Sequence, residues 1–155
     1  MLRNVMAVCV ALGIASPVLA ADVTYRKDIA PLFQAKCGSC HGAESPYLGD
    51  FKENQAKFEA DSQGPRMDTY ADLIFYVGWP DTGALMRRLD DGKNAGGKAG
   101  NMYKRLGSSE EERQKNLALF KEWVGPDAWK LNRWKAKGDV PAITKEELDK
   151  IKVKY

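Results

Sequence analysis

The sequence is poor in the side chains that build metal sites, and it has no long apolar run after its first residues. It contains one histidine, His41, and three cysteines, of which only Cys37 and Cys40 lie beyond residue 20. A structural zinc site takes four nitrogen or sulfur ligands, so these residues are too few to complete one. No later stretch is apolar over the roughly 20 residues that a membrane-spanning helix needs. The formal net charge is only +3, which gives no basis for a nucleic-acid partner.

Residues 1–20 have the three-part layout of a secretory signal peptide. A short positive start with Arg3 precedes an apolar run over residues 5–15, and residues 18–20 offer small side chains at which a signal peptidase cleaves. We therefore predict cleavage after Ala20, a mature chain the size of one modest domain, and a periplasmic location. The alternative is a retained membrane anchor, with peripheral association at a membrane.

Helical patterns predominate in the mature chain, and no strand-like alternation is sustained anywhere. Ile29, Leu32 and Phe33 fall on one side of a predicted helix that leads into Cys37, and Pro31 suits the first turn of that helix. The sequence therefore predicts an all-α fold.

Further helices are predicted along the chain. Ser109 and Glu112 form a capping box at the start of the last large helix, and Thr144 with Glu147 form another before a short terminal helix. Residues 42–66 are interpreted mainly as loop with one short helix. The other expected helices cover residues 68–77 and 82–89.

Cys37-Gly38-Ser39-Cys40-His41 is the most informative segment of the sequence. C-x-x-C-H is the sequence of covalent haem attachment, because thiols at this spacing reach the two vinyl groups of one porphyrin and the adjacent imidazole binds the iron. The alternatives are a thioredoxin-like redox pair, a structural disulfide and half of a zinc site. A redox pair belongs in an α/β pattern, which is absent here. We therefore predict one haem c per chain, with His41 on the iron.

The second iron ligand cannot be a histidine, because His41 is the only one in the chain. Met102 is the favoured candidate, since it follows the glycine-rich residues 92–100 and a loop can bring its sulfur over the haem without unwinding a helix. Met86 lies in an apolar helical pattern and is interpreted as core. Met67 precedes a helix whose apolar side it would cover. The remaining alternatives are a rarer ligand such as lysine and an open position on the iron.

The chain resembles a class I cytochrome c over roughly residues 24–124. That family places a helix directly before C-x-x-C-H, a methionine near the far end, and a C-terminal helix that crosses the first. Phe33 matches the family's aromatic residue at the crossing, with Phe120 and Trp123 as its partners. The resemblance implies a class I cytochrome c domain over residues 21–125 and a C-terminal extension over residues 126–155, which packs on the domain or docks a partner.

The resemblance also implies further residues at the haem. Pro46 and Leu48 lie in a segment similar to the one whose proline carbonyl accepts the N–H of the iron-bound imidazole. Trp79 is expected at the haem edge or as a donor to a propionate, although burial alone would also account for it. The candidate cofactor-binding residues are therefore Cys37, Cys40, His41, Pro46, Leu48, Trp79 and Met102, with His41 and Met102 as iron ligands.

These features predict a monomeric periplasmic electron carrier rather than an enzyme. Its exposed haem edge, ringed by Arg87, Arg88, Lys98 and Lys104, would meet acidic redox proteins transiently. The alternatives are a haem subunit of a larger oxidoreductase and a haem enzyme or sensor with an open sixth position. The start of the mature chain and its basic tail are also similar to periplasmic monohaem cytochromes associated with bacterial iron oxidation.

Two tryptophans of the tail, Trp129 and Trp134, lie among lysines. The favoured interpretation is that the tail wraps the domain and these indoles bury apolar surface. The other is a docking surface in which lysines steer a partner and the aromatic rings contact it.

Overall fold

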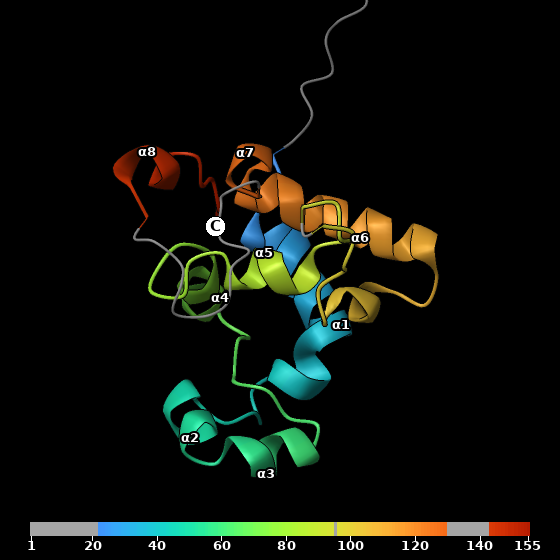
Figure 1. Ribbon diagram of the computed structural model, residues 1–155, viewed down its shortest axis with the longest axis vertical. Coiled ribbons are helices and arrows are strands. Elements are labelled where there is room, and N and C mark those ends of the chain that lie inside the picture. Colours follow the sequence, from blue (N-terminus) through green and yellow to red (C-terminus); the bar gives the residue numbers. More distant parts are fainter. Residues whose placement is uncertain (1–21, 95, 130–142) are drawn as a thin grey trace, which may run out of the picture.

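The computed structural model describes residues 22–94, 96–129 and 143–155. The predicted signal peptide and Trp134 lie outside these ranges. Within them every regular element is helical, which confirms the all-α prediction (Figure 1). The described helices include none that is long and apolar enough to cross a membrane. The elements are η1 (Tyr25–Ile29), α1 (Ala30–His41), α2 (Leu48–Glu53), α3 (Gln55–Ala60), α4 (Tyr70–Val77), α5 (Ala84–Leu89), η2 (Tyr103–Leu106), α6 (Glu110–Val124), α7 (Pro126–Trp129) and α8 (Lys145–Leu148).

The first helix begins as a π-helical turn and continues as an α-helix. The Thr24 hydroxyl accepts the Lys27 N–H at 3.3 Å and caps η1, which merges into α1 at Ala30. Pro31 is the second residue of α1 and lies where the π-helical turn passes into the α-helix. The helix ends at His41, so its last turns carry the whole C-x-x-C-H segment.

Helix α6 contributes four buried apolar residues to the core, Leu117, Phe120, Trp123 and Val124. Phe120 and Trp123 are 0% and 1% exposed, and they share one hydrophobic cluster with Ile29 and Phe33 of the first helix. The contact between the two helices lies mainly on η1, the first turn, and the three aromatic residues predicted at the crossing are all buried.

The start of α6 differs in one detail from the predicted capping box. The Ser109 hydroxyl accepts the Glu112 N–H at 3.1 Å, as expected. The Glu112 carboxylate, however, accepts the N–H and the hydroxyl of Ser108, and it also forms an ion pair with Lys36 of α1. This pair ties the N-terminal end of α6 to the middle of α1.

The Lys36–Glu112 pair predicts a pH dependence of stability. Hydrogen bonds from Lys36 and Ser108 lower the pKa of Glu112 from 4.5 to about 2. A carboxyl group whose pKa falls on folding contributes stability that is fully present above its unfolded pKa and is lost as the pH falls through its folded pKa. We therefore expect Glu112→Gln to lower the urea midpoint at pH 7 and to have a vanishing effect as the pH approaches 2. Glu111→Gln, in the same helical turn, is the control; an equal shift in both variants at pH 7 would contradict the expectation.

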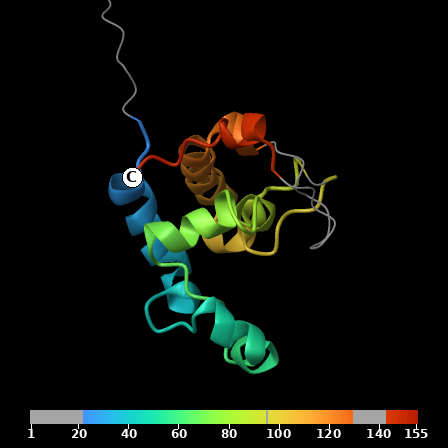
Figure 2. The same ribbon diagram turned by 90° about the vertical axis from the view of Figure 1, so that its left-hand side faces the viewer.

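The C-terminal residues lie against the first described helix (Figure 2). The Val153 N–H donates to the Trp123 carbonyl at 2.9 Å, and the Lys154 carbonyl accepts the Tyr25 N–H at 2.8 Å. The Tyr155 ring stacks on that of Tyr25 with centroids 5.7 Å apart. Residues 151–155 therefore pack over the part of the core that contains Tyr25 and Trp123. The capping box predicted for Thr144 and Glu147 is present at the start of α8.

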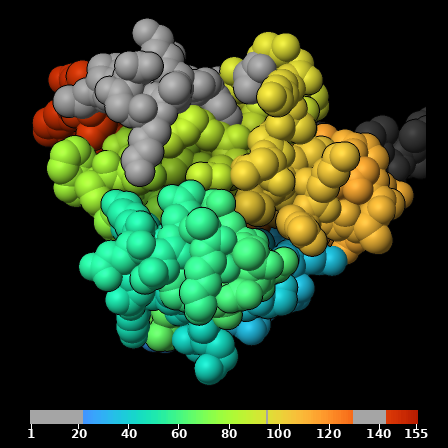
Figure 3. All heavy atoms as spheres, turned by 60° about the horizontal axis from the view of Figure 1, so that its bottom comes forward, coloured from blue at the N-terminus to red at the C-terminus, as the bar shows by residue number. Residues whose placement is uncertain are grey.

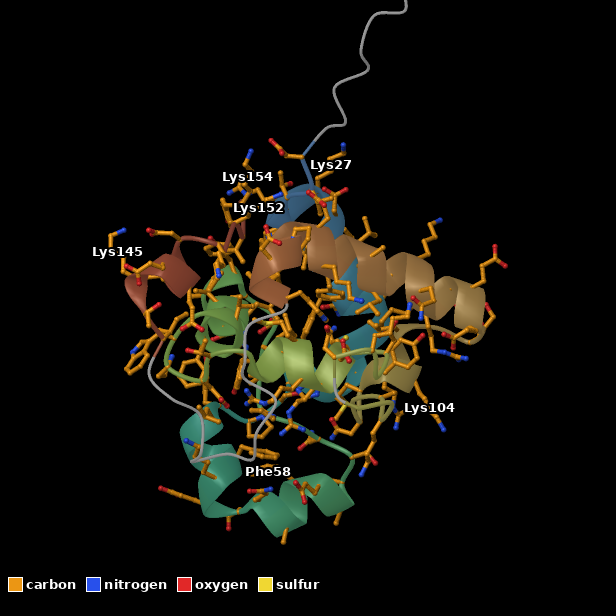
Figure 4. All side chains as sticks on the ribbon, turned by 45° about the horizontal axis from the view of Figure 1, so that its top comes forward. Lys27, Phe58, Lys104, Lys145, Lys152 and Lys154 are labelled. Carbon is orange, nitrogen blue, oxygen red and sulfur yellow. The ribbon has the colours of Figure 1, made fainter. Side chains whose placement is uncertain are left out.

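Residues 42–66 hold two short helices where one was predicted. Helices α2 and α3 pack on each other through Phe51 and Phe58, whose ring centroids are 6.1 Å apart. Phe58 lies between them in Figure 4. The pair projects from the rest of the protein as a separate lobe in two perpendicular views (Figures 1 and 2). This α2–α3 lobe forms one wall of the candidate site.

Candidate haem site

A cavity of about 1250 Å³ lies between the α2–α3 lobe and the body of the protein. Figure 3 shows this face, with the lobe in teal beside the yellow-green α4–α5 region and the gold residues around η2. The volume exceeds the usual 300–1,000 Å³ of small-ligand pockets and suits a large cofactor. Candidate residues that line the cavity are Cys37, Cys40, His41, Leu48, Met67, Trp79 and Met102.

Both cysteines of α1 face this cavity as free thiols. Burial raises the pKa of Cys37 to about 11. Free thiols give no support to a structural disulfide. Among the described residues no group of three or more His, Cys, Asp or Glu side chains could hold a metal ion. The structure therefore does not support a zinc site either.

The His41 imidazole is held by the segment that returns from the α2–α3 lobe. Its Nδ1 lies 2.8 Å from the Pro65 carbonyl oxygen. The backbone on either side is paired with the end of α1: the Gly64 N–H donates to the Cys40 carbonyl at 2.8 Å and the Met67 N–H to the His41 carbonyl at 2.9 Å. Burial lowers the pKa of His41, which favours the neutral ring. A neutral ring that donates from Nδ1 to Pro65 leaves Nε2 as the nitrogen available to a metal.

Gly64 allows this backbone to pass directly against the imidazole. A Cβ atom at this position would lie 2.1 Å from His41 Cε1 and 2.6 Å from Nδ1. Such distances are far below van der Waals contact, so only glycine fits here without moving the ring.

The prediction that the Pro46 carbonyl accepts the imidazole N–H is wrong. That carbonyl accepts the Arg66 N–H at 2.8 Å, and Pro65 takes the place at His41. The reason is the pairing of residues 64–67 with the end of α1, which brings Pro65 rather than Pro46 over the ring. Gly64 is the one local hint in the sequence, because glycine permits a close backbone approach, but it does not by itself distinguish Pro65 from Pro46.

The three candidate methionines have different surroundings. Met86 is 2% exposed within the hydrophobic cluster, as its apolar helical pattern predicts, and does not line the described cavity. Met67 and Met102 both line it. Met67 belongs to the segment that holds His41, whereas the Met102 N–H donates to the Arg88 carbonyl at 2.9 Å, at the end of α5.

The edge of the cavity carries an exposed tryptophan and several basic side chains. Trp79 borders the cavity and is 68% exposed, so burial does not account for it. Arg87 and Arg88 line the cavity as expected, but the described lining omits Lys98 and Lys104 and instead includes Arg105, which the sequence analysis missed.

The C-terminal extension contributes to the body beside this site. Trp129 is 2% exposed and belongs to the hydrophobic cluster, together with Ala128. Its indole therefore buries apolar surface.

This set of residues fits a covalently attached haem. Two thiols one helical turn apart and an oriented neutral imidazole face one large cavity, and a thioether lines the same cavity from another segment. Thiols form the two thioether links, while nitrogen and thioether sulfur are the donors that haem iron takes in cytochromes c.

Comparisons with known proteins agree with this assignment. The sequence profile of the family described as PccH Cytochrome c matches residues 24–155. The solved structure of the monohaem cytochrome PccH from Geobacter sulfurreducens is 58% identical, with a TM-score of 0.75, and the match covers 87% of this chain and 100% of that one. No curated protein sequence matches the chain. Since the profile spans well over half of it, the chain belongs to the PccH cytochrome c family, and it is a monohaem cytochrome c with one covalently bound haem c.

Proposed function

We propose that this protein is a periplasmic carrier of single electrons, in which Cys37 and Cys40 would attach the haem and His41 and Met102 would bind its iron. The observation that carries the proposal is that the Met102 side chain lines the same cavity as His41 but comes from a different segment. Bound haem c supplies a couple that takes up and releases one electron.

The position of Met102 favours it over the other methionines. The second iron ligand would come from a segment other than the one that holds His41, and Met67 is part of that segment. Met86 belongs to the core. Met102 meets both conditions, since it lines the cavity and its backbone is bonded to α5.

A carrier needs little rearrangement when the electron arrives or leaves. The Pro65 carbonyl fixes the orientation of His41, and a thioether ligand from Met102 would raise the potential of the iron relative to two histidines. Apolar side chains such as Phe33, Leu85 and Phe120 line the cavity and exclude water. The only histidine of the chain is already a ligand in this account, so no second imidazole serves as an acid or base for bound oxygen or peroxide.

The cavity edge supports an acidic redox partner. In the part of the chain that the structure describes, five charged lining residues are basic and two, Glu59 and Asp81, are acidic. Lys36 pairs with Glu112 and Arg87 with Asp81. The remaining three, Lys52, Arg88 and Arg105, are exposed, and we call them the basic rim. Complementary charge of this kind raises association rates more than affinity.

We expect the basic rim to control the rate of electron exchange. In Arg88→Glu/Arg105→Glu, oxidation of the reduced protein by hexacyanoferrate(III) should slow roughly threefold to tenfold at low ionic strength, because the attraction for an anion is lost. Oxidation by the cation hexaammineruthenium(III) should not slow. Lys27→Glu, which reverses one charge at the far end of the molecule near both described termini, is the control for a charge reversal away from the cavity (Figure 4).

Stopped-flow rates across a range of salt concentrations test whether the basic rim controls electron exchange. In the unmodified protein the rate with hexacyanoferrate(III) should fall as salt is added. Rates that do not depend on salt, or an equal effect of Lys27→Glu, would contradict a basic docking surface.

A further inference from the structure

A buried carboxylate connects the C-terminal segment to the loop before Met102. Trp129 closes α7 and is 2% exposed, and Asp90 directly after α5 is 0% exposed. The Trp129 indole N–H donates to Asp90 Oδ1 at 3.1 Å. A carboxylate buried this deeply needs such donors, because an unsatisfied one is costly.

Asp90 also holds both ends of the loop over residues 91–101, here named the Met102 loop. Its Oδ2 accepts the Gly92 N–H at 2.9 Å and the Asn94 N–H at 3.2 Å, and its Oδ1 accepts the Asn94 side-chain amide at 2.9 Å. Its backbone carbonyl accepts the Gly100 N–H at 2.8 Å. One residue therefore fixes where the loop leaves α5 and where it returns.

The returning end has no space in which to shift. A Cβ atom on Gly100 would lie 2.3 Å from the carbonyl oxygens of Arg87 and Arg88, so the backbone there touches the end of α5. Two residues later the Met102 N–H donates to the Arg88 carbonyl. The position of Met102 is thus set by the same contacts that Asp90 maintains.

We propose that Asp90 and Trp129 are positioning residues for Met102. Trp129 holds the Asp90 carboxylate, the carboxylate holds the Met102 loop, and the loop holds the thioether at the haem. The inference rests on the proposed role of Met102 as an iron ligand. It gives Trp129 an effect on the strength of the iron–sulfur contact, although Trp129 itself does not line the described cavity.

The test compares two buried tryptophans in the haem-loaded protein. Trp129→Phe keeps an aromatic ring but removes the N–H that reaches Asp90. Trp123→Phe is the matched control, because Trp123 is 1% exposed and its indole N–H donates to the Lys154 carbonyl, at 2.9 Å, away from the loop. Titration of the oxidised proteins with imidazole, followed through loss of the iron–sulfur absorption band, measures how easily Met102 is displaced.

We expect Trp129→Phe to bind imidazole roughly tenfold more tightly than the unmodified protein, since a hydrogen bond to a buried carboxylate is lost. Trp123→Phe should stay within about twofold, although both variants lose thermal stability. Amide hydrogen exchange at Gly92, Asn94 and Gly100 should quicken in Trp129→Phe only.

The outcomes separate the two claims. If Trp129→Phe and Trp123→Phe bind imidazole equally while the unmodified protein shows the iron–sulfur band, Met102 is a ligand but Trp129 does not position it. If exchange quickens without a change in imidazole affinity, the loop is held by Trp129 but the thioether is not. If the unmodified protein lacks the band, the Met102 ligand assignment fails and the positioning role fails with it.

Discussion

Gly64→Ala should prevent normal haem binding, with the yield of haem-loaded protein falling roughly tenfold or more. The added methyl group would lie 2.1 Å from His41 Cε1. Overpacking of a well-packed site costs about 1–3 kcal/mol. Here the ring has nowhere to go, because Pro65 holds Nδ1 and the backbone of residues 64–67 is bonded to the end of α1. Either the imidazole turns away from the haem or the returning segment detaches from α1.

The haem-to-protein absorbance ratio of periplasmic extracts measures this effect. Gly49→Ala is the matched control, because a Cβ on Gly49 meets nothing within 4 Å. Normal haem loading and an unchanged spectrum in Gly64→Ala would show that the imidazole is not confined by this backbone.

Met102→Leu should convert the iron from six- to five-coordinate. Leucine nearly conserves the side-chain volume, and such exchanges usually cost less than about 1.5 kcal/mol, so the fold should persist. What is lost is the sulfur. We expect a high-spin oxidised spectrum, rapid binding of carbon monoxide by the reduced protein, and a lower reduction potential, since the thioether stabilises the reduced iron.

Met67→Leu is the control for this variant. Met67 lines the same cavity and is buried, so its exchange makes a similar change in packing. Its spectrum should remain low-spin and its reduced form should bind carbon monoxide slowly. If Met67→Leu becomes high-spin while Met102→Leu does not, the assignment of the two methionines is reversed.

The sequence predicted the part of the site that depends on local chemistry. Cys37, Cys40 and His41 lie within five consecutive positions of one helix, so their spacing alone brings them together at one surface. The helix pattern around them was equally local, and it gave the positions of α1, α4 and α6 to within a few residues. These predictions required no knowledge of which distant segments meet.

The Pro65 contact could not be derived in the same way. Pro46 and Pro65 lie in the same polar stretch, and either carbonyl is chemically able to accept an imidazole N–H. The choice depends on how the chain returns after α3, which is set by hydrogen bonds between residues 64–67 and the end of α1. Contacts between residues so far apart in the sequence leave no periodic signal in it.

Other features escaped prediction for related reasons. Helices α2 and α3 have six residues each, too few for an apolar period to stand out, and they pack mainly through one pair of rings. The Trp129–Asp90 hydrogen bond spans 39 residues and joins two segments that carry unrelated patterns.

The most direct test of the account is the visible absorption spectrum of the protein expressed in a periplasm, recorded oxidised and reduced. The account predicts a low-spin spectrum in both states, with the weak iron–sulfur band in the oxidised form. A high-spin oxidised spectrum without that band would mean an open position on the iron, and it would contradict the electron carrier with His41 and Met102 as ligands.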